Sequence, residues 1–126
     1  MEMIIGGAFQ GKGLYAKENY PRIHWEKGNT ISEEELFQAE GVLDFQDYIR
    51  KELKKGNELQ NLAEELLRKN PEVILVCQEV GYGVVPMDAF DRKYRELVGR
   101  ICTKLAAGSH KVTRIVCGIG TVIKNA

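Results

Sequence analysis

The sequence lacks several features that mark membrane, secreted or nucleic-acid-binding proteins. Its 126 residues carry 18 basic and 18 acidic side chains, so the formal net charge is zero. A balanced charge gives no electrostatic reason to propose nucleic acid or an anionic membrane as a partner. No apolar run approaches the roughly 18 residues of a membrane-spanning helix, and residues 1–6 lack the basic lead of a signal peptide. We therefore expect a cytoplasmic protein without nucleic-acid or membrane partners.

Cysteine is also scarce. Cys77, Cys102 and Cys117 are odd in number and widely spaced, which fits neither a disulfide framework nor a metal-knuckle spacing. Cys77 and Cys117 each end an apolar run, so we expect both to be buried thiols in a reducing compartment. Hydrophobic residues make up 44% of the chain and charged residues 29%, as in an average globular protein. The length suits a single domain over residues 1–126.

The hydrophobic pattern predicts strands that alternate with helices. Short apolar or β-branched runs predict strands at 3–5, 22–25, 42–43, 72–77, 111–117 and 121–123, and helical spacing predicts helices at 14–18, from 33, from 45 up to Gly56, at 57–69 and at 88–108. Ser32, Asn57 and Asp88 are the expected helix caps, and Gly81, Gly83 and Pro86 mark a loop. This alternation predicts an α/β fold with a mostly parallel sheet and helices on both faces.

The most informative segment follows the first predicted strand. Gly6–Gly13 fits the phosphate-loop pattern G-x-x-x-x-G-K between a strand and a helix. Glycines let backbone N–H groups converge on a phosphate, and the following helix presents its positive end. We therefore predict that the strand ends at Gly6 and that a nucleoside triphosphate binds at eight residues: Gly6, Gly7, Ala8, Phe9, Gln10, Gly11, Lys12 and Gly13. The alternative is a glycine-rich turn with a surface lysine.

One position departs from that pattern. The residue after the lysine is normally Ser or Thr, whose hydroxyl ligates Mg²⁺. Here it is Gly13, which has no side chain. Phosphate binding is compatible with this change, but one direct metal ligand is missing. The sequence therefore supports nucleotide binding more strongly than phosphoryl transfer.

Three further segments complete a family resemblance. Residues 78–86 read Q-E-V-G-Y-G-V-V-P, residues 94–103 read Y-R-E-L-V-G-R-I-C-T, and residues 117–120 read C-G-I-G. With the phosphate loop they resemble the G-G-A-x-x-G-K-S, N-E-V-G-x-G-[IV]-V-P, F-R-D-x-x-G-R-x-N-Q and terminal S-G motifs of the adenosylcobinamide kinase/adenosylcobinamide-phosphate guanylyltransferase family of cobalamin biosynthesis. By motif, the resemblance covers residues 1–18 and 72–124. It implies a P-loop NTPase-like fold, ATP or GTP with Mg²⁺, and a corrinoid substrate.

The resemblance also implies roles for individual residues. Lys12 would hold the phosphates. Asp44 corresponds to the family carboxylate near the metal, and the alternative role for Asp44 is a helix N-cap. Glu79 ends a buried strand, where open α/β sheets bind ligands, and is the second catalytic candidate. The alternative for Glu79 is a carboxylate that ties down the loop at Gly81–Gly83. The short middle of the chain gives it reason to bury surface against copies of itself, so we expect a homo-oligomer.

Guanylyl transfer in the resembling family uses a histidine in an H-x-x-x-R-P-x-H-W stretch. Only residues 21–25, P-R-I-H-W, are similar, and no histidine precedes them. We interpret His24 as a strand-end residue packed beside Trp25 rather than as a nucleotidyl acceptor, and we assign no chemistry to His110. The expected function is therefore an adenosylcobinamide kinase without guanylyltransferase activity. The alternatives are a nucleotide- or corrinoid-binding protein that has lost turnover, and a purely structural oligomer.

Overall fold

The computed structural model describes residues 1–80 and 88–126, and the predicted loop at Gly81–Pro86 lies outside the described residues. Its elements are, in chain order, β1 (Glu2–Gly6), α1 (Lys12–Asn19), β2 (Trp25–Lys27), α2 (Glu33–Leu36), β3 (Gly41–Leu43), α3 (Phe45–Lys54), α4 (Leu62–Lys69), β4 (Ile74–Gln78), α5 (Ala89–Gly108), β5 (Lys111–Val116) and β6 (Ile119–Asn125). The described strands form one sheet in the order β2-β3-β4-β1-β5-β6, in which only β6 pairs antiparallel with its neighbour. The predicted mostly parallel sheet is confirmed.

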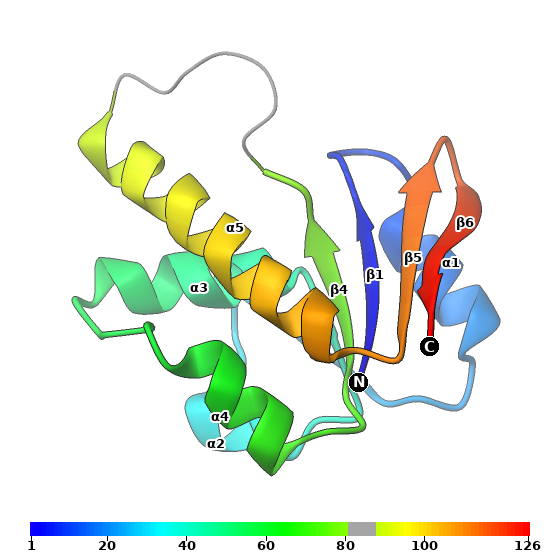
Figure 1. Ribbon diagram of the computed structural model, residues 1–126, viewed down its shortest axis with the longest axis horizontal. Helices are drawn as coiled ribbons and strands as arrows, with labels where there is room; N and C mark the ends of the chain where they lie inside the picture. Colours follow the sequence, from blue (N-terminus) through cyan, green and yellow to red (C-terminus); the bar gives the residue numbers. More distant parts are fainter. Residues whose placement is uncertain (81–87) are drawn as a thin grey trace.

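Helices cover both faces of this sheet. Met3 of β1 and Leu75 of β4 belong to the core that α3, α4 and α5 complete, whereas Ile4 and Val76 belong to a second core with Ala16 of α1. In Figure 1, α1 lies on one side of the sheet and α3, α4 and α5 lie on the other. A strand buried on both faces must be apolar at successive positions, which explains the unbroken V-I-L-V-C run before Gln78. None of the described helices is both long and apolar enough to cross a membrane.

Two of the predicted helix caps are present. Ser32 Oγ accepts a hydrogen bond from the Glu35 N–H at 3.1 Å, and Glu35 Oε1 accepts one from the Ser32 N–H at 3.1 Å, which completes a capping box. The carboxylate of Asp88 accepts from the Phe90 N–H at 2.7 Å and starts α5. Both helices begin where a polar side chain satisfies an otherwise unpaired backbone donor.

The third predicted cap is wrong. Asn57 does not start a helix: α4 begins at Leu62, and the Asn57 amide instead donates to Glu52 of α3 at 2.6 Å. The second strand also differs from its prediction, since β2 begins only at Trp25, where pairing with Gly41 of β3 begins. In both places, contacts with a neighbouring element outweigh the local signal.

The expected burial of Cys117 is wrong as well. The side chain is exposed, because the chain reverses at Cys117 and Gly118, with φ of 51° and 76°, to pair β6 with β5. This pairing also extends the last strand to Ile119–Asn125, beyond its predicted bounds. Cys77, by contrast, is buried as predicted.

Candidate functional site

The segment between β1 and α1 has the geometry of an anion-binding loop. The strand ends at Gly6, as predicted, and the helix begins at Lys12. Between them the backbone is left-handed at Phe9 (φ 59°) and at Gly11 (φ 85°). The Tyr15 N–H donates to the Gly11 carbonyl at 3.0 Å, so the N–H groups of the helix's first turn are directed toward the loop. These donors, with the positive helix end, suit a phosphate; that the loop wraps an anion stays a prediction.

Lys12 lies inside this loop and is not a surface lysine. The residue is 7% exposed, and its Nζ donates to the Gly7 carbonyl at 2.7 Å. Burial lowers the pKa of Lys12, while the nearby side chains of Asp44, Cys77 and Glu79 act in the opposite direction. The ammonium is therefore held beside the loop by one backbone acceptor, which a phosphate oxygen could replace.

The three predicted site residues lie at the carboxyl ends of the parallel strands. Lys12 follows β1, Asp44 follows β3, and Glu79 follows β4. The Glu79 N–H donates to the Gly6 carbonyl at 2.7 Å, which joins the ends of β4 and β1. The strands are parallel, so their carboxyl ends open on the same edge, where α/β sheets bind ligands.

Asp44 stands at the N-cap position of α3 but does not cap it. Its carboxylate makes no hydrogen bond to the N–H groups of that helix, and its contact with Gln46 Nε2 is long, at 3.5 Å. The capping alternative is therefore wrong for the side chain. Asp44 is left-handed (φ 53°), a strained conformation that is enriched at functional sites. Burial first, and then the charge of Asp44, raise the pKa of Asp47, so the two carboxylates are close enough to repel and would favour a cation.

A cavity of about 520 Å³ lies between the start of α1 and these carboxylates. It is lined by Gly13, Leu14, Lys17, Lys27, Asn29, Leu43, Asp44, Asp47 and Val76. A Cβ added at Gly13 would meet no atom within 4 Å, so a hydroxyl side chain would fit there. No group of three or more His, Cys, Asp or Glu side chains in the described part of the chain could hold a metal. That Asp44 holds Mg²⁺ stays a prediction, and such an ion would need water and phosphate oxygens as its other ligands.

Glu79 is held by a residue that sequence reasoning missed. Arg114 of β5 donates from Nε to Oε1 at 2.9 Å and from Nη2 to Oε2 at 3.2 Å. Two parallel charge-assisted bonds fix both the position and the orientation of the Glu79 carboxylate, whose side chain is 13% exposed. The signal in the sequence is an arginine within the predicted strand at 111–117, which also contains Lys111 and Thr113. The alternative role for Glu79, tying down Gly81–Gly83, falls outside the described residues.

The terminal C-G-I-G motif supports the tip of the phosphate loop. Gln10 accepts two backbone hydrogen bonds, one at Oε1 from the Cys117 N–H (2.6 Å) and one at its carbonyl from the Gly118 N–H (2.8 Å). A Cβ at Gly120 would lie 2.6 Å from the Tyr15 ring of α1, so any other residue there would have to displace that ring. The turn between β5 and β6 therefore braces the loop and its helix.

Both histidines lie away from this site. The side chain of His24 is 75% exposed and its Nε2 lies 2.9 Å from Glu26, so the predicted packing beside Trp25 is wrong. His24 precedes β2, and His110 precedes β5, where its Nδ1 lies 3.5 Å from the Met1 amino group. Each therefore lies at the amino end of a parallel strand, whereas the phosphate loop lies at the carboxyl ends of the strands.

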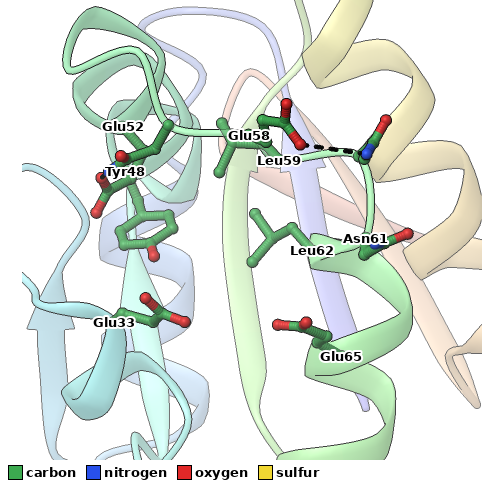
Figure 2. Close-up of a pocket in the computed structure, with 10 residues that line it drawn as sticks. Glu33, Tyr48, Glu52, Glu58, Leu59, Asn61, Leu62 and Glu65 are labelled. Atoms are coloured by element: carbon green, nitrogen blue, oxygen red, sulfur yellow. Dashed lines mark hydrogen bonds between the residues drawn. The ribbon is translucent and has the colours of Figure 1, made fainter.

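A second pocket of about 400 Å³ lies among α2, α3 and α4. Figure 2 shows carboxylates of three different segments, Glu33, Glu52 and Glu65, around Tyr48. Burial, followed by the charges of Glu52 and Glu33, raises the pKa of Tyr48. The negative charges of this pocket would repel a phosphate, so the pocket does not compete with the loop as a nucleotide site.

Comparison with known proteins identifies the family. A family model described as cobinamide kinase / cobinamide phosphate guanyltransferase matches residues 29–123. The chain belongs to this family. Two relatives, the bifunctional adenosylcobalamin biosynthesis proteins CobU of Escherichia coli (strain K12) and Salmonella typhimurium (strain LT2), are each 38% identical to it over 78 residues. The aligned region is 62% of this chain and 43% of each relative, so it spans less than half of their length.

The matched range differs from the motif resemblance in extent. The model match includes the middle of the chain from residue 29, which the motifs left out, and contains Asp44 and Glu79. Gly6–Gly13 lies before the matched residues. Family membership and the P-loop NTPase-like α/β fold are therefore established, while the assignment of the loop as a nucleotide site depends on its own geometry.

Proposed function

We propose that this chain is a nucleoside-triphosphate-dependent kinase that phosphorylates a hydroxyl group of adenosylcobinamide and does not transfer guanylyl groups. The observation that carries the proposal is the buried ammonium of Lys12 inside a glycine-rich loop, with Asp44 and Glu79 at the same sheet edge. The substrate class follows from membership of the family. Together these observations support both a phosphate donor site and a corrinoid acceptor.

Each residue would contribute to positioning and to charge stabilisation. In the transfer, the acceptor oxygen bonds to the γ-phosphorus as the bond from that phosphorus to the bridging oxygen breaks, and negative charge accumulates on the β-phosphate. Lys12 and the first turn of α1 would stabilise that charge. Asp44 would hold Mg²⁺, with Asp47 beside it, and Glu79 is kept in place by Arg114. ATP and GTP are both suitable donors, because the loop recognises phosphates.

The positions of the histidines support the proposed absence of guanylyl transfer. A covalent nucleotidyl intermediate needs a nucleophile at the α-phosphate. His24 and His110 both lie at the amino ends of parallel strands, whereas the phosphate loop lies at the carboxyl ends. We also propose that the chain acts in the cytoplasm as one domain, on small molecules. Its 126 residues suit one domain, and its balanced charge gives no electrostatic reason to bind nucleic acid or an anionic membrane.

A second candidate is a nucleotide- or corrinoid-binding protein without turnover. Gly13 favours it, because this position faces the cavity beside Asp44 yet supplies no metal ligand. In that case the loop would still bind phosphates through backbone donors and Lys12, and only the chemical step would be lost.

The decisive experiment follows a γ-labelled triphosphate in the presence of adenosylcobinamide and Mg²⁺. We expect label on the corrinoid, and a faster reaction in Gly13→Ser, because the new hydroxyl fits the open space there and restores a metal ligand. Lys55→Ala, at an exposed position at the end of α3, should leave the rate unchanged. Nucleotide binding without transfer in both the native chain and Gly13→Ser would favour the second candidate, and no binding would contradict both.

The same reaction with α-labelled GTP tests the second half of the proposal. Neither the protein nor the corrinoid should acquire label, in the native chain or in Gly13→Ser. Acid-labile label on the protein that disappears in His24→Ala would show that His24 is the nucleotidyl acceptor and would overturn this part.

A further inference from the structure

Two thiols face each other across the main core, beside the phosphate loop. Cys77 Sγ of β4 and Cys102 Sγ of α5 are 3.5 Å apart, although 25 positions separate them in sequence. A disulfide has an S–S length of about 2.05 Å, so a modest rotation of both side chains would bring the sulfurs to bonding distance. Cys77 is 1% exposed, and Cys102 is partly exposed.

The pair has a route to solvent through a cavity of about 400 Å³. Its lining includes both cysteines together with Glu79, Val98, Arg114 and Ile123. The hydrogen bond between the two thiols lowers the pKa of Cys102, and the same bond together with burial raises the pKa of Cys77. Cys102 is therefore both the more accessible sulfur and the better nucleophile, since the thiolate is the reactive form.

We propose that Cys77 and Cys102 are an oxidation site that forms a reversible intramolecular disulfide when the protein meets a peroxide. The family motif in the long helix has asparagine where this chain has Cys102, so the site belongs to this chain and is not implied by the family. The inference is independent of the proposed kinase activity, because it concerns only the two thiols and the elements that carry them.

The reaction balances in two steps. The Cys102 thiolate attacks one oxygen of hydrogen peroxide, which forms an S–O bond, breaks the O–O bond and releases hydroxide that solvent protonates to water. The Cys77 sulfur then attacks the sulfenic sulfur of Cys102, so the S–S bond forms and the S–O bond breaks; the departing hydroxide takes the Cys77 proton and leaves as water. Two thiols are thereby oxidised by two electrons, and the peroxide is reduced to two waters. An added dithiol reverses the bond by exchange.

The disulfide would join α5 to the strand end that supports the phosphate loop. Cys77 is followed by Gln78, whose N–H donates to Gln46 Oε1 at 2.9 Å, and by Glu79, whose N–H donates to the Gly6 carbonyl at 2.7 Å. Oxidation therefore places a covalent tether one residue away from backbone contacts of the site. This would hold α5 against β4 at the cavity.

The test is peptide mapping of the full chain with Cys117→Ser, since the exposed Cys117 could otherwise form bonds between molecules. Trypsin cleavage places Cys77 and Cys102 in different peptides. After limiting hydrogen peroxide, denaturation and alkylation, we expect one cross-linked species that joins these peptides, lighter than their sum by two hydrogen atoms. Both thiols should be protected from alkylation, and dithiothreitol should restore them.

Cys77→Ser and Cys102→Ser in the same background are the matched controls, and each should lose the cross-link while remaining monodisperse and helical by circular dichroism. Should either variant fail to fold, mapping of the native chain still decides the question, since the third cysteine lies in its own tryptic peptide. Alkylation of both thiols to the same extent after peroxide as before it would overturn the proposal. So would oxidation of Cys102 to a sulfinic acid without any cross-link.

Discussion

At the scale of single residues, nucleotide binding depends most on Lys12. Its side chain is buried within the loop, where its Nζ donates a hydrogen bond to the Gly7 carbonyl. Burial lowers its pKa, because the ammonium loses part of its hydration in this position. An incoming phosphate would add negative charge next to this ammonium, and charge-assisted bonds of this kind are stronger than neutral ones.

We predict that Lys12→Ala weakens the binding of both ATP and GTP by about tenfold or more, because hydrogen bonds to charged groups contribute roughly 1.5–3 kcal/mol. Isothermal titration with and without Mg²⁺ measures this directly. Lys55→Ala, the exposed control, should bind as the native chain does. Unchanged affinity in Lys12→Ala would mean that the ammonium takes no part in phosphate binding.

At the scale of elements, the four-residue helix α2 depends on its capping box. So short a helix has little intrinsic stability, yet it carries Leu36, which is fully buried in the main core. The chain passes from α2 directly to β3 and then to Asp44. The reciprocal hydrogen bonds between Ser32 and Glu35 therefore help to hold in place the segment that leads to Asp44.

We predict that Ser32→Ala lowers the free energy of unfolding by about 1 kcal/mol, as is typical for the loss of an N-cap side chain. Urea denaturation followed by circular dichroism gives the value. Thr30→Ala removes a neighbouring exposed hydroxyl whose bond to the Lys27 carbonyl is long, at 3.4 Å, and should cost less than about 0.5 kcal/mol. Equal losses in the two variants would argue against a specific role of the box.

At the scale of the whole molecule, the two edges of the sheet differ. The β2 edge is only three residues long and polar at Glu26 and Lys27. The β6 edge is seven residues long, and Ile119 and Ile123 are 70% and 56% exposed. Long apolar edge strands readily pair with other chains. We therefore expect the homo-oligomer to form when β6 of one copy pairs with another copy of the chain.

The measurement is sedimentation equilibrium over a range of concentrations. The native chain should associate, and Ile119→Lys/Ile123→Lys should be shifted toward the monomer, because charged side chains on an edge strand oppose pairing. Thr121→Lys adds one lysine at an exposed polar position of β6 without removing an apolar side chain, and should have a smaller effect. A native chain that stays monomeric throughout, or a double variant that associates normally, would contradict this interface.

Signals contained within a few neighbouring residues were enough to predict much of this protein. The end of β1 at Gly6, the doubly buried strand before Glu79, and the caps at Ser32 and Asp88 are confirmed, because glycine conformations, apolar runs and capping bonds act over short distances. The sequence also placed Lys12, Asp44 and Glu79 after predicted strands, and the parallel sheet brings the carboxyl ends of those strands to the same side.

Only the tertiary structure decided which distant side chains meet. Arg114 reaches Glu79 across 35 positions, and Gln10 receives the Cys117 N–H across 107 positions. Asn57 bonds to α3 instead of capping α4, and Cys117 is exposed because β6 turns back there. Such contacts depend on strand order, register and helix packing, which join residues with no shared local pattern. The sequence by itself therefore determined the elements and the loop, and the packing of the sheet against its helices determined the salt bridge, the brace at Gln10 and the thiol pair.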